Sequence, residues 1–156
     1  MGHPTSELSN IKRSFENWFN TTFSGSFAID FEGVPFQSAN KSEWIQPRLL
    51  TAGSIFHRQV ESGYRGDTLS IIANVNIFVR KSLSQRADRI YTIRDTLFNS
   101  MKEGTSIEIK DYVDGGAIIS TLKSREILDD FVVPVVESED LIQYNFSVIY
   151  NFLRKY

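Results

Sequence analysis

The segment from Asp67 to Met101 changes its hydrophobic period part-way along, and this change constrains the fold more than any other feature. From Leu69 to Val79 apolar residues recur at every second position, which is the period of a β-strand with one buried face. Beyond this strand they recur at steps of three and four, at Leu83, Ala87, Ile90, Leu97 and Met101. That spacing predicts a long amphipathic helix, with Ser82 or Ser84 as N-cap and Gly104 as its end.

The residues before this segment predict a helix followed by two strands. Apolar residues on one helical face, with Thr5 or Ser6 as cap, predict an N-terminal helix that ends within 21–26: Leu8, Ile11, Phe15, Trp18 and Phe19. A short strand is expected at Phe27–Asp30 and a longer one at Ser42–Thr51. Pro47 has no amide proton to donate, so the second strand should be an edge strand or contain a bulge.

The residues after the long helix predict mainly strands. Asp114-Gly115-Gly116 is typical of a hairpin turn between strands at Ser106–Val113 and Ala117–Leu122. The polar segment Lys123–Asp130 is expected to hold a helical turn, and Phe131–Val136 to be extended. The last strand has apolar residues at even positions from Ile142 to Phe152 and polar residues on its other face: Gln143, Asn145, Ser147 and Asn151.

This order of elements predicts one α+β domain that comprises residues 1–156. We expect a mostly antiparallel or mixed sheet, with the N-terminal helix and one long central helix packed on one face. The glycine-containing segment Ala52–Gly66 is expected to form an extended loop or a hairpin arm. Both long strands have one strongly polar face, which we expect to be wet or to line an aqueous space.

Composition excludes several classes of function. Lysine and arginine number 17 against 19 aspartate and glutamate, and the two signs are interspersed, so tight binding of nucleic acid is not expected. There is no cysteine, hence no disulfide, thiolate metal site or cysteine nucleophile. No signal peptide or apolar stretch of about 18 residues is present. We therefore expect a soluble protein made in a cytoplasm, with no membrane partner.

Candidate catalytic and metal-binding residues are few. His3 and His57 are the only histidines, too few for a zinc site or for a supported Ser-His-Asp triad. No phosphate-binding glycine motif occurs, so no cofactor is expected. Five acidic residues cluster in a region expected to be a loop: Asp129, Asp130, Glu137, Glu139 and Asp140. They favour a solvated or interface-facing patch over acid–base chemistry, and we expect that the protein is not an enzyme.

Taken together, the sequence resembles the tail terminator (tail completion) proteins of long-tailed bacteriophages. The likeness is one of pattern and order and covers most of the chain apart from Asp114–Pro134. It rests on the following segments and on the last alternating strand: Asp30-Phe31-Glu32-Gly33-Val34-Pro35-Phe36, Glu43-Trp44-Ile45-Gln46-Pro47, Gly63-Tyr64-Arg65-Gly66, Phe78-Val79 and Arg86-Ala87-Asp88-Arg89-Ile90.

The resemblance implies a structural virion protein at the head-proximal end of the tail. Such a protein forms a homohexameric ring on the tail tube, ends tube polymerisation and presents a joining surface to the head-completion or neck protein. DNA passes through its lumen only in transit. The alternatives are a head-completion or neck connector protein of a phage and a small-ligand-binding α+β domain.

Two sets of residues are candidates for the contacts of such a ring. The first set lies in the arm, where we expect Arg58, Glu61 and Arg65 to contact a neighbouring subunit or the tail tube. The second set is the five acidic residues from Asp129 to Asp140 named above, which we expect at a ring interface or in the lumen. Charged residues at such contacts would set register more than affinity.

Overall fold

Two long antiparallel strands, β2 (Arg65–Arg80) and β5 (Leu141–Arg154), form the centre of the molecule. They pair from Asp67 with Arg154 to Arg80 with Leu141. The computed structural model describes residues 6–59, 65–83, 88–113, 115–133 and 140–154, except for the side chains of 51–59, 65–67 and 153–154. Alternate residues of both strands are buried on one face, as their period of two predicts: Leu69, Ile71, Ala73, Val75, Ile77, Val79, Tyr144, Phe146, Val148, Tyr150 and Phe152.

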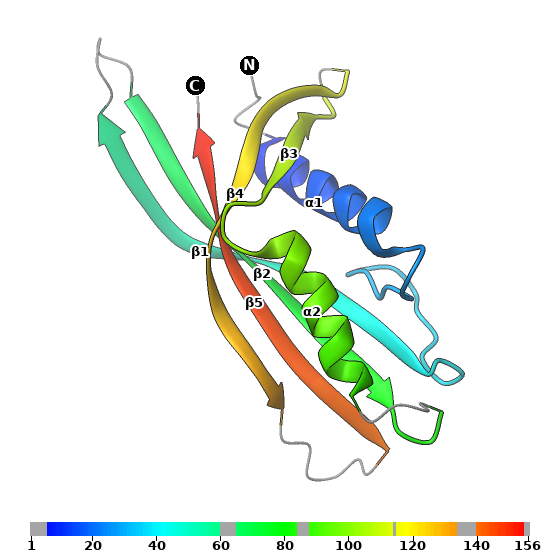
Figure 1. Cartoon of the computed structure of the whole chain (residues 1–156). Helices are drawn as coiled ribbons and strands as arrows, with labels where there is room; N and C mark the ends of the chain where they lie inside the picture. Colours follow the sequence, from blue (N-terminus) through cyan, green and yellow to red (C-terminus); the bar gives the residue numbers. More distant parts are fainter. Residues whose placement is uncertain (1–5, 60–64, 84–87, 114, 134–139, 155–156) are drawn as a thin grey trace.

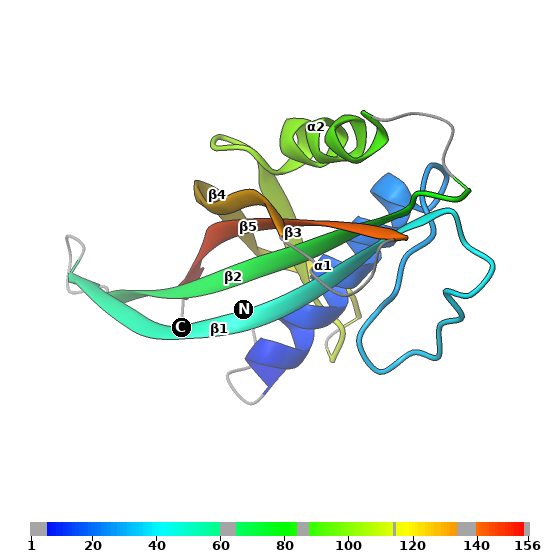
Figure 2. The ribbon, with the colours of Figure 1, turned by 90° about the horizontal axis from the view of Figure 1, so that it is seen from below.

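Three further strands complete one curled antiparallel sheet (Figures 1 and 2). They are β1 (Glu43–Gln59), β3 (Ser106–Asp111) and β4 (Ala117–Val133). The strand order is β1-β2-β5-β4-β3, so β1 and β3 are the two edge strands. The expected α+β class with an antiparallel sheet is confirmed.

Two helices supply the other side of a single hydrophobic core. Helix α1 (Glu7–Phe23) contacts β3, and α2 (Arg89–Met101) lies across β2 and β5 (Figure 1). Both place apolar side chains in the same cluster as the sheet: Ile11, Phe15, Phe19 and Phe23 from α1, and Ile90, Ile93, Leu97 and Met101 from α2. One face of the sheet is therefore the core face, and neither of the two described helices packs on the opposite face at β2 and β5.

The expected long central helix is wrong in its length, because α2 has 13 residues and begins at Arg89. Residues 81–83 form a turn, in which the amide of Lys81 donates to the Asp140 carbonyl and Leu83 is exposed. The guanidinium of Arg89 makes two hydrogen bonds to the Glu43 carboxylate, each 2.7 Å. These long-range contacts fix the position of the turn and of the first residue of the helix. Apolar spacing carries no information about such contacts, so it predicted a helix that begins too early.

The N-terminal region also differs in detail from the prediction. Helix α1 ends at Phe23, within the predicted range, and Phe23 is buried, but Leu8 is 53% exposed and does not face the core. The strand expected at Phe27–Asp30 is reduced to a single bridge between Ile29 and Ile45.

Strand β4 contradicts the helical turn expected at Lys123–Asp130, because this segment is extended and pairs with β5. Beyond Lys123 the strand has no pairing with β3, and most of its side chains are exposed. Two register shifts, between Ser124 and Glu126 and between Ile127 and Asp129, interrupt the ladder. An exposed, bulged edge strand has no regular apolar alternation to detect.

The predicted turns and edges are confirmed where the structure describes them. Gly115 and Gly116 have φ of 73° and 81°, a conformation that glycine adopts without strain. Pro47 lies in the edge strand β1, in agreement with its lack of an amide proton to donate. Strand β1 extends well past Thr51, and its pairing with β2 reaches Gln59 and Arg65. Of the two forms expected for segment 52–66, an extended loop or a hairpin arm, most of the segment therefore adopts the hairpin arm.

Candidate interaction surfaces

The face of the sheet opposite the core carries uncharged polar side chains at its centre. Asn74 pairs with Ser147 and Asn76 with Asn145 across β2 and β5, and because side chains alternate along a strand all four lie on this face. Gln46 of β1 pairs with Asn76 and continues the polar row onto a third strand. We call this surface the helix-free face.

These side chains form one hydrogen-bonded network, with Gln143 as a further member. Asn74 Nδ2 donates to Ser147 Oγ at 2.6 Å, and Asn145 Nδ2 donates to Asn76 Oδ1 at 2.9 Å. Asn76 Oδ1 also accepts from Gln143 Nε2 at 3.0 Å, and Asn76 Nδ2 donates to Gln46 Oε1 at 3.4 Å. The amides satisfy one another, so the centre of the face is polar, ordered and uncharged.

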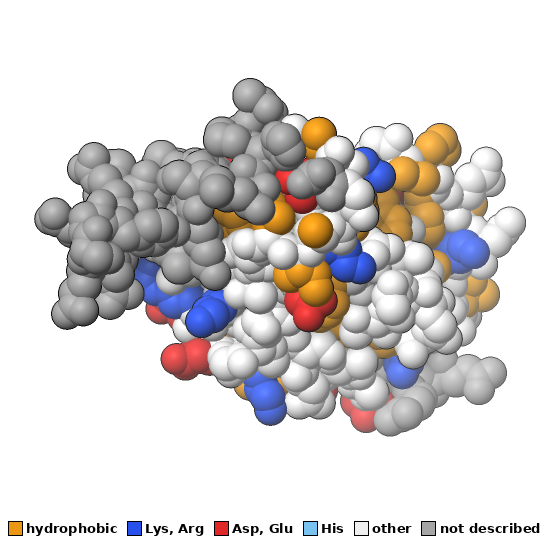
Figure 3. Space-filling view, turned by 90° about the horizontal axis from the view of Figure 1, so that it is seen from above, with side chains coloured by type: hydrophobic (Ala, Val, Ile, Leu, Met, Phe, Trp, Pro, Cys, Tyr) orange, Lys and Arg blue, Asp and Glu red, His pale blue; other side chains and the backbone are white. Residues whose placement is uncertain are grey.

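Aromatic side chains and paired charges border the network. The rings of Trp44 and Phe78 stack at 5.0 Å between centroids, and the Arg80 guanidinium lies 5.7 Å from the Trp44 ring. Arg80 also lies 3.5 Å from Asp140, and Arg48 lies 3.6 Å from Asp30. Both arginines are thus neutralised by a neighbouring carboxylate. On the face drawn in Figure 3, acidic and basic side chains are interspersed among the described residues.

The structure separates the acidic residues that the sequence grouped together. Asp129 pairs with Ser147 in the ladder, so it lies on the helix-free face beside the amide network. Asp130 faces the opposite way, toward α2. Asp140 accepts hydrogen bonds from the amide and hydroxyl of Ser82, at 2.8 and 3.0 Å, and these bonds lower its pKa. Glu137 and Glu139 lie outside the described residues.

Asp130 joins helix α2 to strands β4 and β5. Arg94 Nε donates to Asp130 Oδ1 at 2.8 Å, Arg94 Nη2 donates to Asp130 Oδ2, and the Tyr144 hydroxyl donates to Asp130 Oδ1 at 2.5 Å. The bonds from Arg94 lower the pKa of Asp130. Burial, together with the bond to Asp130, raises the pKa of Tyr144 to about 12. The cluster fixes α2 on the sheet.

The arm residues are only partly described. Arg58 pairs with Gly66 and Arg65 with Gln59 in the backbone ladder, while their side chains and the whole of Glu61 lie outside the described part of the chain. The register of β2 with β5 places the arm at one end of these strands and Asp140 at the other. The arm and Asp140 therefore lie at opposite ends of the long strands, and Asp129 and Asp130 lie between them.

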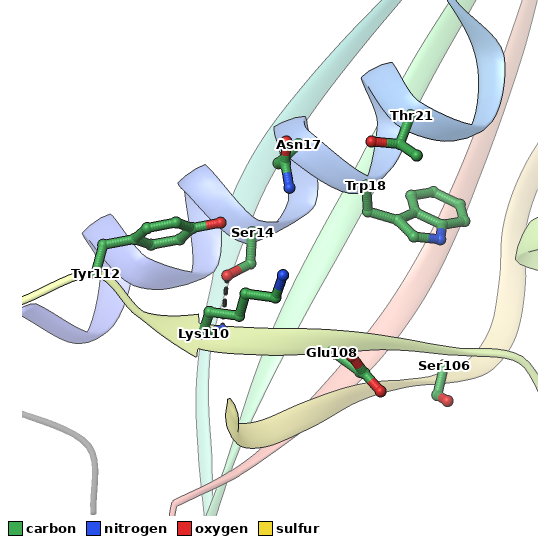
Figure 4. Close-up of a pocket in the computed structure, with 8 residues that line it drawn as sticks. All are labelled: Ser14, Asn17, Trp18, Thr21, Ser106, Glu108, Lys110 and Tyr112. Atoms are coloured by element: carbon green, nitrogen blue, oxygen red, sulfur yellow. Dashed lines mark hydrogen bonds between the residues drawn. The ribbon is translucent and has the colours of Figure 1, made fainter. Parts of the chain in front are cut away.

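A groove of about 410 Å³ lies between α1 and β3 (Figure 4). At one end the two elements touch, because Ser14 Oγ accepts from the Lys110 amide at 2.9 Å and Asn10 Oδ1 accepts from the Tyr112 amide at 3.1 Å. Toward Trp18 and Ser106 the helix and the strand diverge (Figure 4). Further lining residues are Asn17, Thr21 and Glu108.

The sequence predicted the polar faces of β2 and β5. It predicted neither the groove nor the participation of Gln46 in the hydrogen-bonded network. Buried Asn10 and Ser14 on the apolar side of α1 are the one sequence signal for the groove. That signal has no meaning until β3, about 100 positions away, is placed beside the helix.

The described part of the chain offers neither a metal site nor a membrane-spanning helix. No three His, Cys, Asp or Glu side chains in this part of the chain lie close enough together to hold a metal ion. None of its helices is long and apolar enough to cross a membrane.

Comparison with known proteins informs the fold. No protein-family model matches the chain, and no curated protein matches it. A solved structure with no functional name is similar at a TM-score of 0.62, with 10% sequence identity, over 96% of this chain and 96% of its own. At that identity the similarity concerns the fold alone, and a fold does not determine a function.

Proposed function

We propose that this chain is a non-catalytic structural protein that forms a hexameric ring at the end of a phage tail tube. Each copy contacts two others, the ring ends polymerisation of the tube, and its outer surface joins the head-completion or neck protein. In this proposal the arm formed by β1 and β2 grips a neighbouring subunit or the tube. The proposal extends the family resemblance of the sequence, and the helix-free face is the observation that carries it.

The chemistry of the helix-free face suits the passage of DNA. Duplex DNA carries one negative charge for every 1.7 Å or so of its axis, and lysine or arginine on a channel wall would retain it by releasing counterions. The amides of Asn74, Asn76 and Asn145 carry no charge and are hydrogen-bonded to one another. Asp129 beside them would repel phosphate. A channel lined by this face would let DNA slide without holding it.

The curled sheet also suits a ring of copies. Rings form when one surface of a subunit binds a different surface of the next, so that the contact repeats until it closes. The sheet has two different edge strands, β1 and β3, and the arm extends from the β1 side (Figure 1). Such an arrangement offers unlike surfaces on opposite sides of one subunit.

The mass of the purified protein across concentration, measured by light scattering together with negative-stain images, tests this function. A hexamer, or a monomer that forms rings when tubes of the phage's tail tube protein are added, is the expected result. A protein that stays monomeric at every concentration and does not bind the tubes would refute the proposal. Binding to the portal side instead would favour a neck connector.

The double substitution Arg58→Glu, Arg65→Glu tests the part played by the arm. It should prevent ring or tail assembly while the monomer keeps its circular dichroism spectrum and melting temperature. Lys41→Glu, Lys102→Glu is a matched control, because it makes the same change of charge at two exposed positions away from the arm. Normal assembly of the arm variant would show that the arm makes no essential contact.

One observation favours the small-ligand alternative, namely the groove between α1 and β3. Its volume of about 410 Å³ falls within the range of small-molecule sites. Most of its lining residues are polar, whereas such sites are lined mostly by apolar side chains, so this function comes second. A rise in melting temperature in a screen of small ligands would support it.

A further inference from the structure

The free edges of a β-sheet can pair with strands of other molecules, and this sheet protects part of its edges. Along β1, Ile45 is bridged by the segment around Ile29, and its amide donates to the Ala28 carbonyl at 3.0 Å. Pro47 has no amide proton, and its carbonyl accepts from Arg48 Nη1 at 2.8 Å. The free half of β4 is interrupted by two register shifts, which oppose strand pairing.

Strand β3 is protected along only half of its outer edge. The amide of Ser124 donates to the Thr105 carbonyl, so in this antiparallel ladder residues 105, 107 and 109 face β4 and residues 106, 108 and 110 face away. The outward amide of Lys110 is bonded to Ser14 of α1. For Ser106 and Glu108, no hydrogen bond from the outward backbone groups to another described residue is present.

The unprotected half of the edge faces the open end of the groove. Helix α1 diverges from β3 here, and Trp18 and Thr21 form the far wall (Figure 4). A strand added beside Ser106 and Glu108 would lie in this space and accept or donate up to four main-chain hydrogen bonds. Strand addition of this kind derives its affinity from backbone groups and its selectivity from a few side chains.

We propose that the outer edge of the arm strand of a second copy, Ile55–Gln59 in β1, adds to β3 at Ser106–Glu108 and makes the contact between neighbours in the ring. This inference rests on the proposed ring and names its partner surfaces. β1 and β3 are the two opposite edges of the sheet, so pairing one with the other is head-to-tail and repeats around a ring.

Charge complementarity favours the arm as the occupant. Glu108 is exposed at the open end of the groove, and the arm strand carries Arg58. Its partner strand adds Arg65 one ladder step away. A pairing of Glu108 with arginine of the neighbour would fix the register of the added strand.

A proline at position 108 tests the main-chain contact. The amide of Glu108 points away from β4, so Glu108→Pro removes an outward donor and obstructs an added strand without removing a bond of the internal ladder. Glu108→Ala is the matched control that removes only the side chain. We expect the proline variant to lower the association constant between copies by roughly tenfold beyond the alanine variant, as expected for one or two lost hydrogen bonds.

A charge exchange tests the partner segment and remains informative should the proline variant fail to fold. Arg58→Glu and Glu108→Arg should each weaken the ring in light scattering, and the double variant should recover most of the loss. Additive losses in the double variant would overturn the assignment of the arm to this edge.

The outcomes also separate this inference from the proposed function. If the wild-type protein forms no ring, with or without tubes, the function itself fails. If wild type and Glu108→Pro form equally stable rings, the ring stands and the strand addition is wrong. Association that is lowered more by proline than by alanine, and that is restored by the charge exchange, supports both.

Discussion

At the scale of single residues, two neighbouring tyrosines of β5 use their hydroxyl groups differently. The Tyr144 hydroxyl donates to Asp130, whereas the ring of Tyr150 is fully buried and its hydroxyl has no hydrogen-bond partner among the described residues. Burial raises the pKa of Tyr150 well above its usual value. A buried hydroxyl without a partner costs free energy, because it gave up its bonds to water on folding.

Replacing each tyrosine by phenylalanine should therefore have opposite effects. Tyr150→Phe should leave the free energy of unfolding unchanged or raise it by up to about 1 kcal/mol, and Tyr144→Phe should lower it by about 1–2 kcal/mol. Urea unfolding of the three proteins at pH 7 measures both. A clear loss of stability in Tyr150→Phe would reveal a partner for this hydroxyl.

At the scale of elements, α1 is attached to the sheet by polar side chains as well as by its apolar stripe. Asn10 is 1% exposed, donates to Asp111 Oδ1 at 3.2 Å and accepts from the Tyr112 amide. Ser14 accepts from the Lys110 amide one turn further along. The two side chains take the place of a neighbouring strand for this half of β3, so helix and edge strand stabilise each other.

Removing this attachment should be costly. Asn10→Ala leaves the Tyr112 amide and the Asp111 carboxylate without these bonds in a buried place, and we expect a loss of about 1–3 kcal/mol in the free energy of unfolding. Leu8→Ala on the exposed side of the same helix is the control and should change stability by less than about 0.5 kcal/mol. Equal effects of the two substitutions would contradict the role given to Asn10.

At the scale of the whole molecule, the proposed ring requires the centre of the helix-free face to remain free of added positive charge. The substitutions Asn76→Lys and Asn145→Lys would add two positive charges per subunit to this face. The ring should then bind duplex DNA with an affinity that falls steeply as salt is raised, because lysines release counterions from phosphate. Fluorescence anisotropy of a labelled duplex across NaCl concentrations measures the effect.

A control separates the face from the charge. Thr96→Lys and Asn99→Lys add the same charge on the exposed side of α2, outside the proposed channel. Equal DNA binding by both double variants would show that the helix-free face does not line a channel.

Much of the architecture could be predicted because it depends on local patterns. The period of two in β2 and β5 follows from burial of one face of each strand, and the glycines of the β3–β4 turn adopt the positive φ that their type allows. Pro47 indicated an edge strand for the same kind of reason. These features need no knowledge of the rest of the fold.

The misplaced elements depend on partners far away in the sequence. The start of α2 is set by contacts of Arg89 with Glu43 and of Lys81 with Asp140. The extended form of Lys123–Asp130 depends on pairing with β5, since an exposed edge strand carries polar residues on both faces. Neither contact leaves a periodic signal in the sequence.

The sequence by itself determined the two long strands, most of the apolar stripes of both helices and the polarity of the helix-free face, because each of these leaves a regular alternation of apolar and polar residues along the chain. Only the tertiary structure decided which polar groups meet. It separated Asp129 from Asp130 across the sheet, joined Gln46 to the amide network, and brought α1 beside β3 to leave half an edge open. Hydrogen bonds and sheet edges depend on the spatial arrangement of distant segments, which hydrophobic periodicity does not encode.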